Sequence, residues 1–404
     1  MLKLLTCAQG HFWEKQVEDE SGEQRDTCPV CGQAAETMPL LDLAPSETQP
    51  ATPTEPPAPP PLRAKGGRPV IAGFEIQDDL GKGPTGLYLY RARQVLINRT
   101  VLLKVVFARE DPGQFAWGSL RGEAAALGRL SHPNIVQVFE AGERDRQLFY
   151  NAVEYVDGPT LADVLKGKPL PWRQALALVE TLARAMHVAH ESKLLHRSLK
   201  PSCILLQPVE TARGTGPSAY CRLRAGLYLP KITDFGLAKR LVEGDAIDLE
   251  LQGELPCYLS AEQAWGRAKD IGPATDVYAL GTILYELLTG QPPFRGETVL
   301  QTLDAIQYKE VVPPSRLRSG IPRDLDAICR KCLDKQPRRR YASALDLATD
   351  LRRCADGYPT KARAAGGGVR LGKWLRRNLR TVVLVLLACL SLALLAFPSC
   401  TAIR

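Results

Sequence analysis

The chain is organised around the stretch His196-Arg197-Ser198-Leu199-Lys200-Pro201-Ser202-Cys203. A helical run from Leu176 to Ser192 leads into it, and the apolar residues 204–206 follow it. Further along, an expected strand over 230–233 ends at Asp234-Phe235-Gly236. The pattern therefore predicts two polar loops, each attached to regular secondary structure, that carry the candidate chemistry of the chain.

These two loops resemble the catalytic loop and the metal loop of the eukaryotic-type protein kinases, with two changes. The family pattern is His-Arg-Asp-Leu-x-x-x-x-Asn, and here Ser198 stands at the Asp position and Cys203 at the Asn position. The family Asp accepts the proton of the attacking hydroxyl, and the hydroxyl of Ser198 is far too weakly basic to replace it near pH 7. Cys203 offers soft sulfur where magnesium prefers hard oxygen. The resemblance therefore implies a kinase fold whose phosphoryl transfer is weakened or lost.

A second group of motifs follows the strand-like residues Phe74-Glu75-Ile76. A glycine-rich stretch runs from Leu80 to Gly86, and such a stretch alone is weak evidence. Alone, Lys104 would be an ordinary strand lysine, but Glu123 follows it on an expected helix in kinase order. The resemblance implies that Lys104 grips the ATP phosphates and that Glu123 orients it. The residues implied to hold ATP or to act on it are Gly81, Gly83, Gly86, Lys104, Glu123, Glu154, Val156, Lys200 and Asp234, and Asp234 would also hold magnesium.

Later motifs resemble those of a complete large lobe. Residues 253–262 resemble the end of an activation segment, and residues 276–281 resemble the central helix of that lobe. Arg340 resembles the family arginine that pairs with the activation-segment glutamate, here Glu262. We therefore predict an α+β fold with a small, mainly β amino-terminal lobe, a mainly helical carboxy-terminal lobe and a nucleotide cleft between them. Cys329-x2-Cys332 has metal-like spacing, but it lies in a helical pattern with no second pair nearby, so core thiols explain it better.

Two positions beside the expected adenine site are bulkier than in the family. Leu102 stands two residues before Lys104, where the family has Ala. On the other wall the family has Val, and the residue here is Tyr88 by direct count from Gly86, or Leu89 if one residue is inserted. The sequence leaves both alignments open. Because packing in such a site is tight, we expect weak ATP binding.

The segment between Leu237 and Pro256 contains no Ser, Thr or Tyr, so phosphorylation cannot switch it there. Glu254 replaces a family Thr that contacts the catalytic Asp. The acidic residues of this segment either present standing negative charge to Arg197 or form a solvated loop.

The charge distribution argues against a general nucleic-acid binder. The chain has 404 residues, 45% of them hydrophobic and 24% charged, and a net charge of +8. Seven basic residues and no acidic one lie between Lys361 and Arg380, and without them the net charge would be +1. We therefore expect no nucleic-acid partner, and we expect the basic segment to face a membrane surface.

Residues 1–38 contain Cys7, His11, Cys28 and Cys31, with Cys28 and Cys31 on a Cys-x2-Cys-Gly turn. This spacing predicts a small zinc-ribbon-like module with a structural zinc ion, and the alternative is a set of unrelated thiols and a surface His. The Pro-rich residues 39–72 predict an extended spacer, with an SH3-type ligand as the alternative.

The carboxy-terminal residues 381–397 are uncharged and strongly apolar, and Arg376, Arg377 and Arg380 precede them. They predict a single transmembrane helix, with the kinase-like domain on the cytoplasmic side of the cytoplasmic membrane. The alternative is a buried core helix. The predicted domains are 1–38 (zinc ribbon), 39–72 (linker), 73–356 (kinase-like domain), 357–380 (basic juxtamembrane segment), 381–397 (transmembrane helix) and 398–404 (external tail).

Three functions remain open from the sequence, and the family most resembled is the bacterial membrane-anchored Ser/Thr kinases. The first is a pseudokinase that acts as a scaffold or allosteric partner of a protein, such as another kinase. The second is a slow but active Ser/Thr kinase that uses Asp234, Lys104 and magnesium on a protein substrate. The third is an adaptor that works through the zinc ribbon and the Pro-rich spacer.

Overall fold

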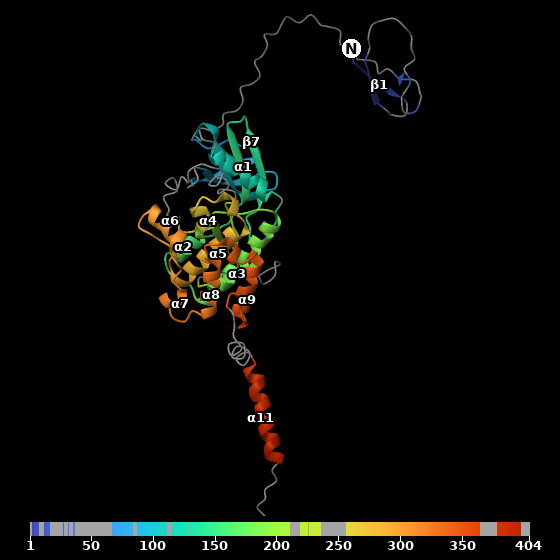
Figure 1. The fold of residues 1–404 in the computed structure, drawn as a ribbon. Helices are drawn as coiled ribbons and strands as arrows, with labels where there is room; N and C mark the ends of the chain where they lie inside the picture. Colours follow the sequence, from blue (N-terminus) through green and yellow to red (C-terminus); the bar gives the residue numbers. More distant parts are fainter. Residues whose placement is uncertain are drawn as a thin grey trace, which may run out of the picture. The chain divides into compact units, whose positions relative to one another are not determined.

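The computed structural model (Figure 1) describes residues 2–7, 12–16, 27, 31, 35–36, 67–83, 87–110, 115–128, 130–210, 219–224, 226–235, 256–363 and 378–396. The chain divides into two compact units, residues 1–60 and 61–404. In the first unit β1 (Leu2–Cys7) pairs antiparallel with β2 (Phe12–Gln16) and with β3 (Ala35–Glu36). These strands form a small sheet of order β2-β1-β3.

The predicted zinc site falls largely outside the described residues. His11 and Cys28 are not described, and only the backbone of Cys7, at the end of β1, is. Within the described ranges, no group of three or more His, Cys, Asp or Glu residues could hold a metal ion. The zinc site therefore stays a prediction, and residues 39–66 of the expected linker also lie outside the described residues.

The small lobe of the second unit is built on a five-stranded antiparallel sheet of order β4-β5-β6-β8-β7. Alternate side chains of a strand point to opposite faces. On one face Val101, Leu103 and Val105 are buried in one apolar cluster, and on the other face Val106 packs with Leu120 of the helix. The elements are β4 (Phe74–Lys82), β5 (Tyr88–Gln94), β6 (Arg99–Phe107), α1 (Phe115–Leu127), β7 (Val138–Arg144) and β8 (Leu148–Glu154).

The large lobe is mainly helical, which confirms the predicted two-lobed architecture (Figure 1). In α3 the residues Leu178, Leu182 and Ala185 follow helical spacing and are fully buried. Both Cys329 and Cys332 are fully buried in α8, as expected of core thiols. The helices are α2 (Leu161–Leu165), α3 (Trp172–Glu191), α4 (Ala261–Ala264), α5 (Pro273–Thr289), α6 (Val299–Tyr308), α7 (Pro314–Leu317), α8 (Arg323–Cys332) and α9 (Ala344–Ala355), with 3₁₀ turns at Ala108–Glu110, Pro201–Cys203, Ala268–Asp270 and Pro337–Arg339.

A second sheet brings the two candidate loops together. Its strands β9 (Ile204–Pro208), β10 (Cys221–Leu223) and β11 (Gly226–Ile232) are antiparallel in the order β10-β11-β9. Ile204 pairs with Ile232, and the amide of Thr233 donates to the carbonyl of Cys203 at 2.9 Å. Because β9 leaves the His196–Cys203 loop and β11 enters the Asp234 loop, this pairing places the two loops side by side.

The structure corrects the prediction of a transmembrane helix over residues 381–397. Residues 381–397 do fall on a helix, α11 (Leu379–Ala396), which has 18 residues. No helix in the described part of the chain is long and apolar enough to cross a membrane.

Candidate active site

Three charged side chains meet where the small lobe faces the Asp234 loop. The Lys104 Nζ lies 2.6 Å from Glu123 Oε1 and 2.9 Å from Asp234 Oδ1. Burial disfavours the charge on Lys104, but the two carboxylates outweigh it and raise its pKa. Burial also disfavours a charged Asp234, yet Lys104 holds the pKa of that carboxyl below its ordinary value. The site therefore keeps Lys104 cationic and Asp234 anionic.

Each of the three residues is placed by a different element. Lys104 points from β6 to the face that carries α1, and Glu123 lies on α1. Asp234 follows β11 and has a left-handed backbone with φ +65°. Glu123 and Lys104 are almost fully enclosed, whereas 32% of the Asp234 side chain is exposed. Asp234 is thus the most exposed member of the cluster.

The catalytic-loop backbone is held by a buried carboxylate. Asp276 of α5 accepts hydrogen bonds from the amides of His196 at 3.0 Å and Arg197 at 2.7 Å, and its Oδ2 lies 2.8 Å from His190 Nε2. Burial alone would raise the pKa of Asp276, but its partners, His190 first, hold it below its ordinary value. The Gln263 side chain donates to the Arg197 carbonyl at 2.7 Å. The loop is therefore fixed through its backbone, independently of the side chain at position 198.

His196 joins the catalytic loop to the Asp234 loop. Its Nε2 lies 2.9 Å from the Thr233 carbonyl, and its ring lies 4.7 Å from the ring of the buried Phe235. Burial lowers the pKa of His196. A neutral, buried imidazole here supports the loops and is not placed to act on a substrate in solvent.

The two substituted positions carry a buried hydroxyl and a buried thiol. The Ser198 Oγ is buried and has no hydrogen-bond partner among the described residues. Cys203 is 3% exposed, and its thiol donates to the Ser198 carbonyl at 3.7 Å. Burial raises the pKa of Cys203 to about 12, so the thiol stays protonated near neutral pH. Sulfur is also a soft ligand, whereas magnesium prefers hard oxygen.

The glycine-rich stretch is described at its two ends. Gly81 has φ +87°, a conformation that favours glycine, and its amide donates to Asp79 Oδ1 at 2.9 Å. The Gly83 amide donates to the Leu87 carbonyl at 2.8 Å. Gly86 lies outside the described residues. The described part therefore shows that the chain on either side of residues 84–86 is joined by a backbone hydrogen bond.

The strand register resolves the open alignment at the adenine wall. Leu89 pairs with Lys104 across β5 and β6, so both side chains lie on the same face of the sheet. Tyr88 lies on the opposite face, where its ring is 5.6 Å from that of Phe107. Leu102 shares the face of Lys104 and packs against the large-lobe core. Leu89 and Leu102 are therefore the two wall residues, and one residue is inserted in the glycine-rich stretch.

The expected hinge is tied to the large-lobe sheet by an ion pair. The buried Lys231 of β11 lies 2.9 Å from Glu154 Oε1 and donates to the Pro133 carbonyl at 2.9 Å. Val156 is half-buried and packs against the large-lobe core. The Glu154 side chain is thus held in an ion pair with the large-lobe sheet.

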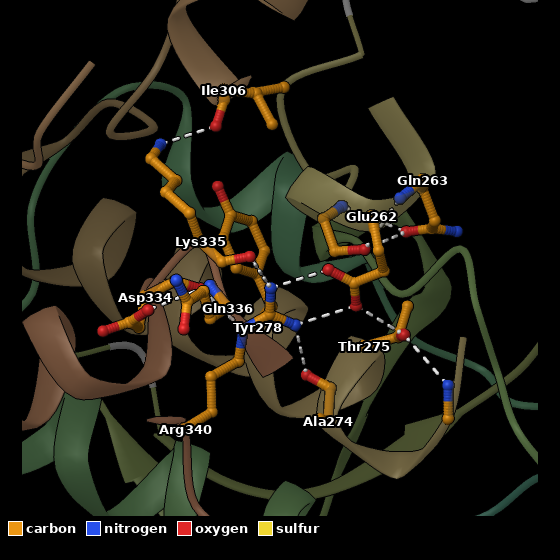
Figure 2. A network of polar contacts seen from close by, with 12 residues as sticks. Glu262, Gln263, Ala274, Thr275, Tyr278, Ile306, Asp334, Lys335, Gln336 and Arg340 are labelled. Atoms are coloured by element: carbon orange, nitrogen blue, oxygen red, sulfur yellow. Dashed lines mark hydrogen bonds and ion pairs between the residues drawn. The ribbon is translucent and has the colours of Figure 1, made fainter. Parts of the chain in front are cut away.

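The predicted pair of Glu262 and Arg340 is confirmed (Figure 2). The guanidinium of Arg340 donates to both carboxylate oxygens of Glu262, at 2.8 and 2.6 Å, and to the Ala274 carbonyl at 2.9 Å. The Thr275 hydroxyl donates to Glu262 Oε1 at 2.7 Å. Burial would raise the pKa of Glu262, but Arg340 holds it below its ordinary value. The network fixes α4, which follows the activation segment, to α5 and to the turn before α9.

The retained residues fit the phosphates of a nucleotide and one magnesium ion. A cationic Lys104 suits phosphate oxygens, and the partly exposed carboxylate of Asp234 suits a hard cation. Lys200 begins the turn Pro201–Cys203 in the same loop and is half-buried. A second metal ion has no suitable ligand at Cys203.

The structure has a β-rich lobe and a helical lobe. The cluster of Lys104, Glu123 and Asp234 lies beside a loop whose backbone amides donate to the buried Asp276. Together these features define a protein-kinase fold. The family model described as a protein kinase domain matches residues 74–350, and the chain belongs to this family.

Similar proteins are bacterial kinases. The chain is 33% identical over 297 residues to the serine/threonine-protein kinase PknB of Mycobacterium leprae, which covers 72% of this chain and 44% of the relative. It is 31% identical to PknB of Mycobacterium tuberculosis over the same shares, 72% and 44%. A probable serine/threonine-protein kinase of Clostridium perfringens is 31% identical, over 67% of this chain and 36% of the relative. The chain thus spans less than half of the length of these relatives.

Proposed function

We propose that this chain is a serine/threonine-kinase-like signalling protein that binds ATP and magnesium weakly and transfers phosphate poorly. It would act on a partner protein as a scaffold or allosteric partner. One observation carries the proposal: the buried Ser198 hydroxyl and the protonated Cys203 thiol occupy the positions of the base and of the second metal ligand. Both lie in a loop that otherwise keeps its hydrogen bonds.

The chain's own residues would divide the work as follows. Lys104 would hold phosphate oxygens, Glu123 would keep Lys104 in place, and Asp234 would hold the metal ion. Bound ATP and magnesium would supply the transferable phosphoryl group and the charge that stabilises its transfer. Nothing at Ser198 accepts the proton of an attacking hydroxyl. Loss of a general base typically costs about 10²- to 10⁴-fold, so a usual kinase rate of about 1–100 s⁻¹ would fall to about 10⁻⁴–1 s⁻¹.

The test is a radiolabelled-ATP transfer assay on the full chain, with Lys104→Met as the matched control for contaminating kinases. We expect wild-type transfer to a generic Ser/Thr peptide to lie within that slow range or at the level of Lys104→Met. Transfer at about 1–100 s⁻¹ that disappears in Lys104→Met would overturn the proposal.

A slow but active kinase is the second candidate function, and the intact ion pairs of Lys104 with Glu123 and Asp234 favour it. The same assay separates the two functions. Measurable wild-type turnover above that of Lys104→Met supports residual catalysis, whereas equal rates support a scaffold without catalysis.

An adaptor function of the amino-terminal unit is the third candidate, favoured by the separate sheet that β1, β2 and β3 form there. We expect the purified full chain to contain about one zinc ion, because four soft ligands complete a tetrahedral site. Elemental analysis by mass spectrometry of wild type beside Cys28→Ser with Cys31→Ser measures this. A wild-type chain without zinc removes the metal from this candidate.

A further inference from the structure

The face of the small-lobe sheet that carries α1 holds two buried polar side chains. Lys104 and Asn151 are paired across β6 and β8, and the neighbouring pair on this face is Val106 with Phe149. Lys104 is 3% exposed and Asn151 is fully buried. Leu120 of α1 packs with Val106 and Phe149. An apolar row and a polar row therefore lie side by side beneath the helix.

Asn151 uses its amide group to hold the helix. Its Nδ2 donates to the Leu120 carbonyl at 2.8 Å. Leu120 lies three residues before Glu123, which places both on the same side of α1. Burial raises the pKa of Glu123, and Lys104 and the Asn151 amide act against that rise. One turn of α1 is thus held by two adjacent side chains, Lys104 through the Glu123 carboxylate and Asn151 through the backbone.

We propose that Asn151 is a positioning residue that docks α1 on the sheet so that Glu123 stays paired with Lys104. The proposal deepens the proposed function and rests on it where nucleotide binding is concerned. Apolar contact between Leu120, Val106 and Phe149 is non-directional and tolerates sliding. A hydrogen bond to a backbone carbonyl requires one position and one orientation of the helix. Undocking would leave a buried amide without its partner, which is unfavourable.

The sequence of the activation segment explains why a permanent contact between α1 and the sheet would be useful. In protein kinases the Lys–Glu pair must be in place for transfer, and phosphorylation of the activation segment controls it. The segment between Leu237 and Pro256 has no Ser, Thr or Tyr. The position of α1 therefore depends on contacts that are always present, and among these Asn151 supplies a hydrogen bond to the helix backbone.

The first experiment measures native-state hydrogen exchange of residues 115–127 in the full chain. Asn151→Leu keeps a side chain of similar size and removes the hydrogen bond. The control is Asn134→Leu, because Asn134 is 2% exposed and donates to the carbonyls of Ala219 at 2.7 Å and Pro230 at 2.8 Å, neither of which belongs to α1. We expect exchange in α1 to rise about tenfold in Asn151→Leu and to stay near the wild-type rate in Asn134→Leu. No rise, or an equal rise in both variants, would overturn the proposal.

If Asn151→Leu does not fold, Asn151→Ala replaces it, because alanine cannot overpack the site. The same rise in α1 exchange is expected. Failure of both variants to fold would make Asn151 a general determinant of stability and would also overturn the proposal.

The second experiment measures the Kd of Mg-ATP by calorimetry in a double-mutant cycle with Glu123→Gln. We expect Asn151→Leu to weaken binding about three- to tenfold in the wild-type background and to have little further effect in Glu123→Gln. Additive losses would mean that Asn151 does not act through Glu123. If the wild type binds no nucleotide, nucleotide binding by the proposed function fails, and the exchange measurement alone decides the role of Asn151.

Discussion

The two halves of the candidate site differ in what they have kept. On the nucleotide side, Lys104 keeps its contacts with Glu123 at 2.6 Å and with Asp234 at 2.9 Å. On the transfer side, Ser198 and Cys203 carry no charge, although Asp276 and Gln263 still hold the loop backbone. The comparison shows that the loop conformation depends on backbone contacts, so the side chains at positions 198 and 203 can differ from the family pattern without loss of the fold.

The largest expected effect is obtained by restoring the transfer side. Ser198→Asp with Cys203→Asn should raise the rate of phosphoryl transfer about 10²- to 10⁴-fold, because a general base returns to a loop that is already positioned. The same double variant in the Lys104→Met background is the control. No gain over wild type in a radiolabelled-ATP assay would contradict the view that positions 198 and 203 limit transfer.

Removal of the Asp276 carboxylate, which accepts hydrogen bonds from the catalytic-loop backbone, should lower the stability of the fold. Asp276→Ala leaves the amides of His196 and Arg197 without their buried acceptor, and we expect a loss of about 3–5 kcal/mol in the free energy of unfolding. Urea denaturation followed by circular dichroism measures it. Ser198→Ala, which breaks no hydrogen bond among the described residues, should change stability by less than about 0.5 kcal/mol. Similar losses in both would contradict the view that the backbone contacts carry the fold.

The buried pair of Glu262 and Arg340 should contribute a pH-dependent part of the stability. Because the folded-state pKa of Glu262 is below its ordinary value of 4.5, its contribution is complete above about pH 4.5 and is lost as pH falls through the folded-state pKa. Glu262→Gln with Arg340→Met should therefore reduce the loss of stability between about pH 5 and pH 3. Denaturant midpoints measured across this pH range for both proteins check the expectation. The same pH dependence of the midpoint in wild type and variant would be inconsistent with it.

The smallest expected effect concerns the adenine wall. Leu102→Ala should tighten Mg-ATP binding about three- to tenfold, because it removes bulk from the face that Leu102 shares with Lys104. Calorimetric titration measures the Kd. The control is Leu103→Ala on the opposite, fully buried face, which should lower stability without improving affinity. Unchanged affinity in Leu102→Ala would mean that this side chain does not fill the adenine site.

The sequence motifs predicted the two lobes and the Lys104, Glu123 and Asp234 cluster, because these residues occur in local runs whose spacing is diagnostic. They also predicted the pair of Glu262 and Arg340. They did not predict the hydrogen bond of Asn151, whose partner is a backbone carbonyl 31 positions earlier. A single Asn inside the apolar run 148–153 was the only available signal, since a buried amide needs a partner.

Other features could not be predicted from the sequence alone. Counting from Gly86 could not decide whether Tyr88 or Leu89 is the wall residue. Only the pairing of β5 with β6 showed that Leu89 lies on the same face of the sheet as Lys104. Asp276 was recognised as part of a helix motif, but its three hydrogen-bond partners come from two other segments. The apolar run 381–397 predicted a transmembrane helix, which is wrong for the helices that the structure describes.

The motifs alone show the protein-kinase family, and they also show that position 198 lacks a carboxylate and position 203 lacks an amide, because the identity of a side chain and its place in a motif are local facts. The tertiary structure decided which face each strand residue takes, which loop carbonyls and amides meet Asp276, and that the Cys203 thiol is buried and protonated. Burial and partnership depend on segments that are far apart along the chain, and they arise only when the fold brings those segments together.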